Sequence, residues 1–431
     1  MSQPLRLGIA GLGTVGVGLI ELLNGQAELL TTRVGRPLVV TAVSARSQRD
    51  RGVDLSAMAW CADPAELASR DDVDLVVELM GGEGDPAKSL CQAALAAGKS
   101  VVTANKALLA LHGTELARIA EANGAILGYE AAVAGAIPIV KAVREGLAGN
   151  GFRRLAGILN GTCNYILTQM QSTGRDFAEV LAEAQALGYA EADPSFDVDG
   201  IDAAHKLAIL TTLAYGTETD FDAIHIEGIR DVEALDIAFA AELGFRIKLL
   251  AIAAATEHGI EQRVHPCMVQ ADTPIAYVDG AFNAVETQTD YADRSVFEGR
   301  GAGAHPTASA VVADIVDIAR GRDGMTYSVP VTALKPLSPA PMDRHEGPYY
   351  VRLEVYDQPG VIADISAILR DESISIESLL QRGRATDANG SVPVVLITHE
   401  VGEAAMLRAL ARIGDLDSVR DRPRMIRIEY L

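Results

Sequence analysis

The sequence predicts an α/β protein in three parts: a Rossmann-like parallel sheet at the N-terminus, an α+β domain after it, and a ferredoxin-like domain at the C-terminus. In the first part, short apolar segments alternate with helical patterns, which is typical of parallel strands joined by crossover helices. From about Pro138 the predicted helices become longer. From Tyr349 the elements follow the order β-α-β-β-α-β, which is the ferredoxin-like arrangement.

The first part is expected to span residues 1–137 and to be completed by residues 305–330. Its strands are expected at 5–10, 38–43, 74–79, 100–103 and 125–129. A long apolar-faced helix at 307–320 is expected to pack back on these strands.

The middle part is expected at 138–304, with helices at 177–187, 203–215 and 232–243 and a strand at 247–255. Five prolines crowd positions 330–348, so that a semi-rigid linker is predicted at 331–348. The last domain, 349–431, is expected to have strands at 349–356, 375–380, 392–401 and 425–430 and helices at 361–370 and 403–413.

Length and charge exclude several classes of protein. The 431 residues leave room for about two to four domains. Because 49% of them are hydrophobic, wholesale disorder is excluded. The 37 Lys and Arg residues against 58 Asp and Glu residues give a net charge of −21, and this field would repel phosphate-rich surfaces. We therefore expect neither nucleic acid nor a membrane among the partners.

The N-terminus and the cysteines indicate a soluble, cytoplasmic protein. The first residues lack the pattern of a secretory signal, and no apolar run reaches the ~20 residues of a membrane-spanning helix. The four cysteines are far apart and include no Cys-x-x-Cys pair, which argues against a disulfide framework or a thiolate zinc site. We expect them to be small buried hydrophobes.

A glycine-rich turn between the first strand and the first helix predicts a dinucleotide site. Gly11, Gly13 and Gly16 form a G-x-G-x-x-G pattern that also includes Thr14 and Val15. The first glycine permits the turn, the second lets the backbone approach a pyrophosphate, and the third allows close helix packing. The helix N-terminus adds amide donors. A tight turn without a ligand is the alternative.

The end of the second strand favours NADP(H) over NAD(H). NAD sites usually place an acidic residue there to bond the ribose 2′-hydroxyl. Here the chain continues through Arg46 and Ser47, with no acid before Asp50. The Arg46 guanidinium suits a 2′-phosphate. Two alternatives stay open. The protein could use NAD(H), or the basic loop could be solvated without contacting a cofactor.

An acidic stretch from Gly188 leads into an almost entirely apolar helix. Asp202 and Lys206 are four residues apart on that helix, so they can meet as an ion pair. In a partly desolvated pocket, Lys206 could donate a proton to an oxygen that gains charge. A surface ion pair beside helix-capping acids is the alternative.

Two further polar stretches follow predicted strands. Asn160, Gly161 and Thr162 lie in a glycine-hinged turn, and Lys106 comes shortly after the strand at 100–103. Ligands of open α/β sheets bind at the carboxyl ends of strands. Lys106 is therefore a candidate for the nicotinamide end of the cofactor, with an ordinary helix-start lysine as the alternative.

Together these segments resemble homoserine dehydrogenase of the bacterial type with a C-terminal ACT domain. The resemblance covers nearly the whole chain and is most specific at 160–162 and 189–206. It implies NAD(P)-dependent interconversion of L-aspartate 4-semialdehyde and L-homoserine, a step toward threonine, methionine and isoleucine. The middle part would then be the catalytic and oligomerisation domain, and the chain is expected to form a homodimer or homotetramer.

The resemblance also implies roles for single residues. Lys206 would be the acid/base, oriented by Asp202, with Lys106 at the cofactor as its helper or replacement. Glu191 would hold the substrate amine. The other substrate-binding residues would be Asp197, Asn160, Gly161, Thr162 and Tyr189, and Gly303 would join the cofactor site.

By the same resemblance, a monovalent cation, sodium, would lie on main-chain carbonyls, a ligand type that suits hard cations. Its ligands would be Glu130, Val133, Gly135 and Ile137. In the ACT domain, Asp357 and Gly360 would mark the turn that binds an amino-acid effector, threonine, for feedback inhibition. An ACT domain that only mediates assembly is the alternative. A chain that ends near Pro341 is expected to stay active and to lose its threonine response.

Two other functions stay open at this point. One is another NADP-dependent amino-acid dehydrogenase, and the other is a catalytically silent amino-acid sensor with an inherited nucleotide fold. The presence of Glu191, Asp202 and Lys206 together argues against the sensor.

Overall fold

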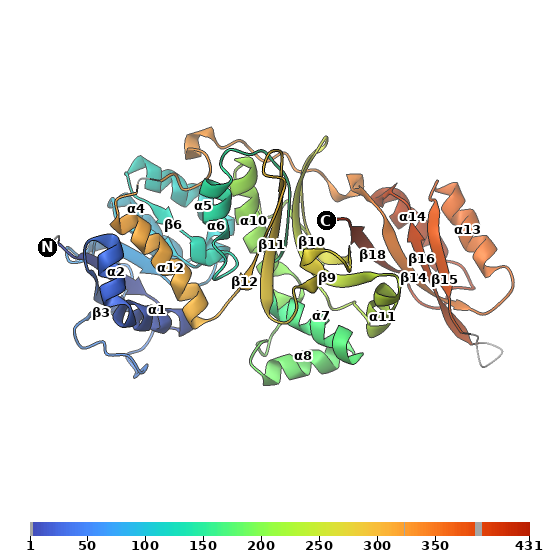
Figure 1. Ribbon diagram of the computed structural model, residues 1–431, viewed down its shortest axis with the longest axis horizontal. Helices are drawn as coiled ribbons and strands as arrows, with labels where there is room; N and C mark the ends of the chain where they lie inside the picture. The colour runs from blue at the N-terminus through green and yellow to red at the C-terminus, as the bar shows by residue number, and fades with distance from the viewer. Residues whose placement is uncertain (1–2, 323, 384–389) are drawn as a thin grey trace.

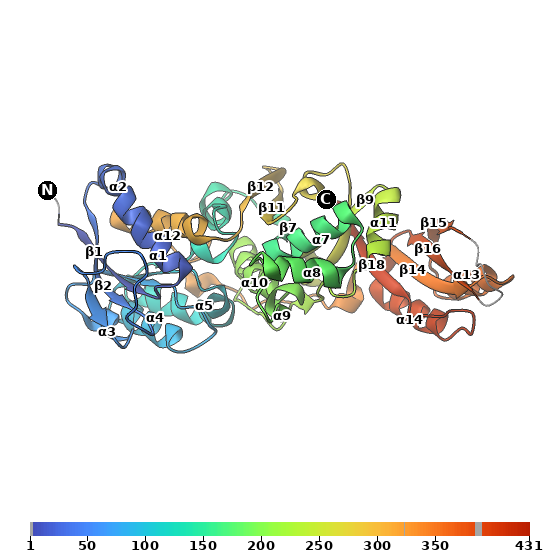
Figure 2. The same cartoon turned by 90° about the horizontal axis from the view of Figure 1, so that it is seen from below.

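The protein is elongated, with a parallel sheet at one end and a second, longer sheet that continues through the rest of the molecule (Figure 1). The computed structural model describes residues 3–322, 324–383 and 390–431. Seen from below, α7, α8 and α10 lie together on the near side of the central region, between the two ends (Figure 2). None of the described helices is long and apolar enough to cross a membrane.

The N-terminal sheet has six parallel strands in the order β3-β2-β1-β4-β5-β6. The order reverses at β1, so the carboxyl ends of β1 and β4 open on the crevice in which α/β sheets bind ligands. Its strands are β1 (Leu5–Ala10), β2 (Leu38–Ser44), β3 (Ala59–Cys61), β4 (Leu75–Glu78), β5 (Ser100–Thr103) and β6 (Leu127–Gly128).

Helices cover both faces of this sheet, as apolar strands without alternation require. Neighbouring residues of β4 point into the two different cores: Val76 packs with α4 and α5, and Val77 packs with α1 and α12. The late helix α12 therefore returns to the first part of the chain and lies beside α1 (Figure 1). The helices are α1 (Thr14–Gly25), α2 (Ala27–Val34), α3 (Glu66–Ser69), α4 (Ala87–Ala96), α5 (Lys106–Ala122) and α12 (Ala304–Ala319).

The middle part is an antiparallel sheet with helices packed against it. Its strands are β7 (Phe152–Ile158), β9 (Phe245–Thr256), β10 (Gly259–Gln270), β11 (Phe282–Thr289) and β12 (Arg294–Arg300), with the short β8 (His225–Ile226) beside β10. Its helices are α6 (Ile139–Lys141), α7 (Gly161–Thr173), α8 (Phe177–Ala186), α9 (Ser195–Val198), α10 (Ile201–Tyr215) and α11 (Ala234–Glu242). The strands β10, β11 and β12 were not predicted from the sequence. Buried polar side chains obscure the apolar alternation in β10 and β11, and β12 has no buried residue.

The C-terminal part has the predicted ferredoxin-like order. It runs β14 (Tyr349–Tyr356), α13 (Val361–Asp371), β15 (Ile376–Gln381), β16 (Ser391–Thr398), α14 (Glu403–Gly414) and β18 (Arg424–Glu429), with strand order β18-β14-β16-β15. Its edge strand β18 pairs in parallel with β10, Cys267 opposite Arg427. The middle and C-terminal sheets are therefore one continuous sheet.

The stretch 331–348, predicted as a semi-rigid linker, lies along the middle part of the molecule. The proline-rich stretch is hydrogen-bonded along the middle part: the Ile260 amide donates to the Ser338 carbonyl (2.8 Å), and the Glu218 amide donates to the Lys335 carbonyl (2.8 Å). In addition, one face of the C-terminal sheet packs on α11, because the Tyr350 hydroxyl (3.0 Å) and the Arg352 guanidinium (2.6 Å) both donate to Asp236 Oδ1 of α11. Loss of this part would uncover both a strand edge and an apolar face.

Short elements complete the fold. They are the turns η1 (Glu130–Ala132), η2 (Ala142–Gly146), η3 (Pro274–Tyr277), η4 (Val331–Ala333) and η5 (Met342–Arg344), and the two-stranded pair β13 (Glu346–Gly347) and β17 (Val401–Gly402). The four cysteines are free and buried, which confirms the sequence prediction.

Candidate active site

The glycine turn after β1 has the shape of a phosphate cradle. Gly11 has φ +102°, and a Cβ there would lie 2.4 Å from the Leu79 carbonyl oxygen. A Cβ at Gly16 would lie 2.1 Å from the Gly11 carbonyl oxygen, so that only glycine lets α1 start so close to the turn. A Cβ at Gly13 would meet nothing within 4 Å. The backbone at Gly13 is thus open to a ligand, and the turn fits a dinucleotide pyrophosphate.

The basic loop after β2 lies beside this turn. The Arg51 Nε donates to the Leu12 carbonyl (3.0 Å), and its guanidinium lies over the Trp60 ring, 5.9 Å from the centroid. Arg46, which the sequence selected for the 2′-phosphate, is exposed at the start of the same loop. Arg51 was not selected from the sequence, because its contact with the glycine turn depends on the fold.

The carboxyl ends of β4 and β5 carry a buried carboxylate. Glu78 accepts hydrogen bonds from the Met80 amide (2.7 Å), the Gly81 amide (3.2 Å) and the Thr103 hydroxyl (2.6 Å). Burial raises the pKa of Glu78 above its ordinary value. These bonds fix the two turns that lead to Asn105, whose side chain accepts from the Leu108 amide (3.1 Å) and so caps α5 just before Lys106.

Two lysines meet on one carboxylate at this edge of the sheet. Lys206 Nζ donates to Asp202 Oδ2 (2.6 Å), and Lys106 Nζ lies 3.1 Å from Asp202 Oδ1. Lys206 Nζ also donates to the Leu159 carbonyl (2.6 Å). Lys206 is only 8% exposed, which rejects the alternative of a surface ion pair. The structure thus joins the end of β5, the end of β7 and the start of α10 in one site.

The two ammonium groups have opposite pKa shifts. Burial lowers the pKa of Lys206, and the charge of Lys106 lowers it further, although Asp202 opposes both. For the more accessible Lys106, the charge of Asp202 outweighs burial and raises the pKa. Burial alone would raise the pKa of Asp202, but the two ammonium groups hold it well below its ordinary range. Asp202 is therefore a fixed anion between two cations.

Asn160 connects this centre to a second carboxylate. Its Nδ2 donates to Asp197 Oδ1 (2.7 Å) and to Asp202 Oδ2 (2.9 Å), and its Oδ1 accepts from the Cys163 amide (2.8 Å). Asn160 is thus both the N-cap of α7 and a bridge between two acids. Burial, followed by the negative charge of Asp202, raises the pKa of Asp197.

The other predicted substrate residues surround these groups at the surface. The Thr162 hydroxyl donates to the Tyr189 carbonyl (2.8 Å), and the Tyr189 ring packs on Tyr165 with centroids 4.7 Å apart. Glu191 is exposed, and Gly161 is pressed against the chain at Ala281. Sequence reasoning missed Phe196, whose ring lies 5.7 Å from Lys106 Nζ. Its position in the acidic stretch was the only available signal.

The segment 130–137 is irregular in the way that a carbonyl site requires. Ala134 and Gly135 both have φ +55°, and a Cβ at Gly135 would lie 2.5 Å from Gly301. The Glu130 carboxylate accepts from the Val140 and Lys141 amides (2.9 Å each), and burial together with the charge of Asp314 raises the pKa of Glu130 to about 7. That side chain is occupied as a helix cap. The oxygens of this segment that remain for a cation are therefore main-chain carbonyls, including those of Val133 and Ile137.

The remaining predicted residues begin helices. Gly303 has φ +125° and is the N-cap of α12, whose first turn touches α1 at Gly18, where a Cβ would lie 3.1 Å from the Ala304 carbonyl. Gly303 thus lies beside the helix that starts at the glycine turn. In the C-terminal part, Gly360 has φ +100° and is the N-cap of α13, directly after the turn that contains Asp357.

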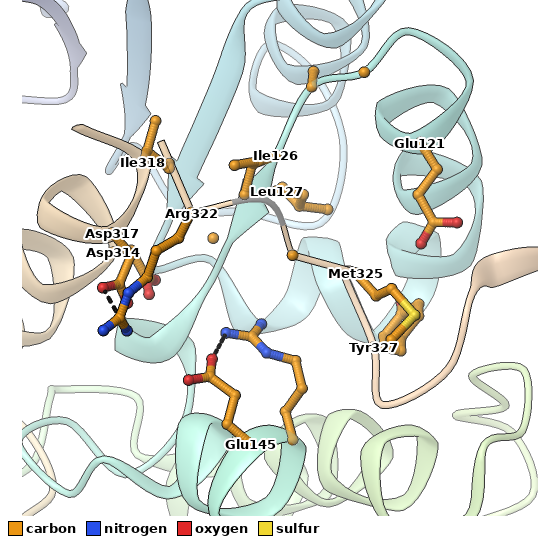
Figure 3. A pocket seen from close by; sticks show the side chains of 15 residues that line it. Glu121, Ile126, Leu127, Glu145, Asp314, Asp317, Ile318, Arg322, Met325 and Tyr327 are labelled. Carbon is orange, nitrogen blue, oxygen red and sulfur yellow. Dashed lines mark hydrogen bonds and ion pairs between the residues drawn. The ribbon is translucent and has the colours of Figure 1, made fainter. Parts of the chain in front are cut away.

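A separate cavity of about 770 Å³ lies at the open edge of the N-terminal sheet (Figure 3). Its walls come from β6, η2, α12 and the chain near Tyr327, and its charged groups include the Arg144–Glu145 and Arg322–Asp317 pairs. None of the site residues predicted from the sequence lines it. The reactive groups described above therefore do not share this cavity.

Comparisons with known proteins agree with the three parts of the chain. The family described as "Homoserine dehydrogenase, NAD binding domain" matches residues 11–130, the family "Homoserine dehydrogenase" matches residues 138–316, and the ACT domain family matches residues 349–415. A homoserine dehydrogenase of Neisseria gonorrhoeae is 45% identical over 435 residues, covering 100% of this chain and 99% of that protein. One of Mycobacterium tuberculosis is 42% identical, covering 99% of this chain and 98% of that protein.

Solved structures give the same result. A homoserine dehydrogenase from Thiobacillus denitrificans matches with a TM-score of 0.94 and 43% identity over 99% of both chains. A hyperthermophilic archaeal homoserine dehydrogenase in complex with NADPH matches 75% of this chain and 100% of its own, with a TM-score of 0.65 and 28% identity.

Proposed function

The chain belongs to the homoserine dehydrogenase family, and we propose that Lys206, Asp202 and Lys106 carry the proton chemistry of its reaction. As an oxidoreductase of amino-acid biosynthesis it interconverts an aldehyde and an alcohol with a nicotinamide cofactor. The observation that carries this proposal is the pair of ammonium groups that share the buried Asp202 carboxylate at 2.6 and 3.1 Å.

The glycine turn would hold a nicotinamide cofactor, which would supply the hydride for aldehyde reduction and accept it in homoserine oxidation. Lys206 gives a proton to the aldehyde oxygen as negative charge develops there, and takes the proton from the hydroxyl in the reverse direction. Asp202 keeps the ammonium aimed at one place by holding it on a fixed oxygen. Each direction thus transfers one hydride and one proton.

The choice between the two lysines follows from their environments. A buried ammonium with a lowered pKa exchanges its proton more readily near neutral pH than an ordinary lysine does. Lys206 has such an environment, whereas the pKa of Lys106 is raised. Lys106 lies next to the same carboxylate and contributes positive charge, which stabilises the developing alkoxide and helps to keep the pKa of Lys206 low.

Substrate binding is assigned to the acidic groups around this centre. Glu191 and Asp197 provide negative charge for the substrate amine, and Asp197 is already anchored by Asn160. Asn160, Gly161 and Thr162, predicted as a turn, form the N-cap and first turn of α7, and the Thr162 hydroxyl ties this helix start to Tyr189. These groups suit the amino-acid end of homoserine, while the lysines suit the end that reacts.

We assign NADP(H) as the preferred cofactor, with Arg46 at the 2′-phosphate and with Gly11, Gly13, Thr14, Val15, Gly16 and Gly303 around the rest of the nucleotide. The strand end lacks the acidic residue that NAD sites use, and Arg51 already ties the basic loop to the glycine turn. The archaeal relative named above was solved with NADPH. NAD(H) is the competing cofactor.

Replacing Arg46 by aspartate is expected to raise KM for NADP by on the order of tenfold, the effect of losing one charged hydrogen bond. KM for NAD should change little, because NAD has no 2′-phosphate. The Arg49→Asp variant makes the same charge change three residues along the loop and serves as the control. Equal effects of the two variants on both cofactors would show that only the net charge of the loop matters.

We assign a monovalent cation, sodium, to the main-chain carbonyls of Glu130, Val133, Gly135 and Ile137. Consecutive residues with positive φ turn this short segment sharply, and carbonyl oxygens are suitable ligands of a hard cation. The Ala136 amide donates to the Arg300 carbonyl (3.0 Å), which holds the segment against the end of β12. The cation would stabilise the connection between the first two parts of the chain.

For the ACT domain we propose feedback inhibition by an amino acid, threonine, bound at the turn Asp357–Gly360. A left-handed glycine directly before α13 presents the first amides of an 11-residue helix to a carboxylate. The enzyme is proposed to act as a homodimer or homotetramer, with homoserine and aspartate semialdehyde as its substrates.

The test is a steady-state assay of homoserine oxidation with NADP and with NAD, each with and without threonine. Turnover that prefers NADP and falls with threonine supports the assignments. Turnover of other hydroxy or amino acids in place of homoserine would indicate a different dehydrogenase. An enzyme that is insensitive to threonine would reduce the ACT domain to a role in assembly.

A further inference from the structure

A second buried lysine lies outside the site described above. Lys248 lies on β9, opposite Cys267 of β10, and is only 1% exposed. Its Nζ donates to the Val278 carbonyl (2.6 Å), to Asp279 Oδ1 (3.2 Å) and to Asn164 Oδ1 (3.3 Å). All three protons of the ammonium are thus directed at oxygen atoms. Such a charge is kept inside a protein only where its partners are held in place.

Asn164 extends this contact into a node between three segments. While its Oδ1 accepts from Lys248, its Nδ2 donates to three carbonyls of one loop, at Val278 (2.9 Å), Gly280 (2.9 Å) and Phe282 (3.2 Å). The Gly280 amide in turn donates to the Thr168 hydroxyl (3.1 Å), one turn further along α7. The loop 278–282 is therefore fastened to both β9 and α7.

This node lies one helical turn from the active-site asparagine. The Asn164 amide donates to the Asn160 carbonyl (3.2 Å) in the first turn of α7. The loop also touches the residue after Asn160, since a Cβ at Gly161 would lie 2.9 Å from the Ala281 carbonyl oxygen. The axial position and the rotation of the first turn of α7 thus depend on the position of the loop 278–282. Asn160 can bridge Asp197 and Asp202 only if that start is in place.

We propose that Lys248 is a positioning residue for the active site: through Asn164 and the loop 278–282 it holds the start of α7 so that Asn160 bridges Asp197 and Asp202. Lys248 touches neither of the reactive lysines in the contacts above, so it acts through Asn160. This inference rests on the proposed roles of Asp202 and Lys206. A methionine would fill the same space, but it could not direct three donors at the loop and at Asn164.

The test is the Lys248→Met variant of the full-length enzyme, measured in homoserine oxidation. We expect kcat to fall by on the order of 10- to 100-fold, because small displacements of catalytic groups have effects of this size. The Kd for NADPH should not change, because the nucleotide turn lies in the other sheet. The Lys99→Met variant removes a partly buried lysine of the N-terminal part, whose Nζ donates to the Arg70 carbonyl (2.6 Å), and should keep full activity.

A double-mutant cycle separates positioning from loss of folding. Asn164→Leu and Lys248→Met should each lower kcat, and the double variant should be no worse than the more severe single variant, since both act through one node. If Lys248→Met does not fold, Thr168→Val, which removes the contacts of the Thr168 hydroxyl with the Gly280 amide and the Asn164 carbonyl and leaves Lys248 in place, should still lower kcat several-fold with unchanged Tm. Additive losses, or a kcat within twofold of the parent in the folded variants, would overturn the proposal.

The pH profile provides an independent readout. Displacement of Asn160 removes a hydrogen-bond donor from Asp202, so the pH dependence of kcat/KM should shift in Lys248→Met and not in Lys99→Met. A variant that is merely less stable would lose amplitude without a shift. Failure of the proposed function can be distinguished from failure of this proposal. The former would appear as full activity of Lys206→Met, and the latter as full activity of the folded Lys248→Met variant.

Discussion

Replacing Lys206 by methionine is expected to lower kcat by about 10²–10⁴-fold in both directions, which is the usual range for losing a general acid or base. The side chain is buried, and its ammonium is held by Asp202 and by the Leu159 carbonyl at 2.6 Å each. Methionine retains the packing on the apolar helix α10 and removes the proton. The Kd for NADPH, measured by fluorescence, should stay nearly unchanged.

The Lys106→Met variant is the matched comparison, because its ammonium lies on the other oxygen of the same carboxylate. We expect a smaller loss of kcat from Lys106→Met than from Lys206→Met, since Lys106 contributes charge and not the transferred proton. A loss below tenfold for Lys206→Met, together with a larger loss for Lys106→Met, would transfer the acid/base role to Lys106.

Lys106→Met and Asp202→Asn both retain Lys206, and they should move the pH profile of kcat/KM in opposite directions. With Lys206 as the proposed base, homoserine oxidation needs its neutral form, so kcat/KM for oxidation should rise as the pH rises through the pKa of Lys206, and kcat/KM for aldehyde reduction should fall over the same range. Burial and Lys106 lower this pKa, whereas Asp202 raises it. Lys106→Met should therefore move the rising limb to higher pH, and Asp202→Asn should move it to lower pH. Unmoved limbs would mean that another group titrates.

A chain that ends near Pro341 is expected to fold poorly, contrary to the expectation from sequence. The truncation removes β18 and so leaves the β10 edge unpaired from Cys267 to Val269. It also removes the C-terminal sheet from α11, whose buried Asp236 accepts from Tyr350 and Arg352 and whose Ile237 and Phe239 lie in the apolar core that the C-terminal sheet joins. With several large apolar side chains exposed, a fall of Tm on the order of 10 °C or outright aggregation is expected. Differential scanning fluorimetry and size-exclusion chromatography measure these outcomes.

A single substitution tests the same junction without removing any chain. Arg427 is 3% exposed and joins Glu403 of the C-terminal part to Glu227 of the middle part. Arg427→Met leaves the buried Glu403 without its cation, which typically lowers the free energy of unfolding by about 3–5 kcal/mol. Arg408→Met breaks a pair between α14 and Glu372 at the end of α13, and it should have little effect because Arg412 still pairs with Glu372. An Arg427→Met variant with an unchanged Tm, together with a soluble and active chain truncated near Pro341, would show that the junction between the middle and C-terminal parts is dispensable.

Part of the active site could be predicted from local spacing. Asp202 and Lys206 are one helical turn apart, so any helix through them brings the two side chains together. The glycine turn is equally local, because three glycines in a strand-turn-helix context dictate its shape. In contrast, Asn160 reaches Asp202 across 42 positions of sequence, and no periodicity relates the two. Lys106 joins them only because the ends of β5, β7 and α10 meet.

The amino-acid sequence by itself determined the order of elements in the N-terminal and C-terminal parts, the glycine turn after the first strand and the ion pair on α10. Each of these depends on residues within a few turns or on apolar periodicity, which act before distant segments meet. Only the tertiary structure decided that β18 continues the sheet of β10, that Lys106 and Lys206 share one carboxylate, and that Lys248 meets Asn164 of α7. Such contacts join segments far apart in the chain, and their geometry is set by packing and by the burial of charge, which no local pattern encodes.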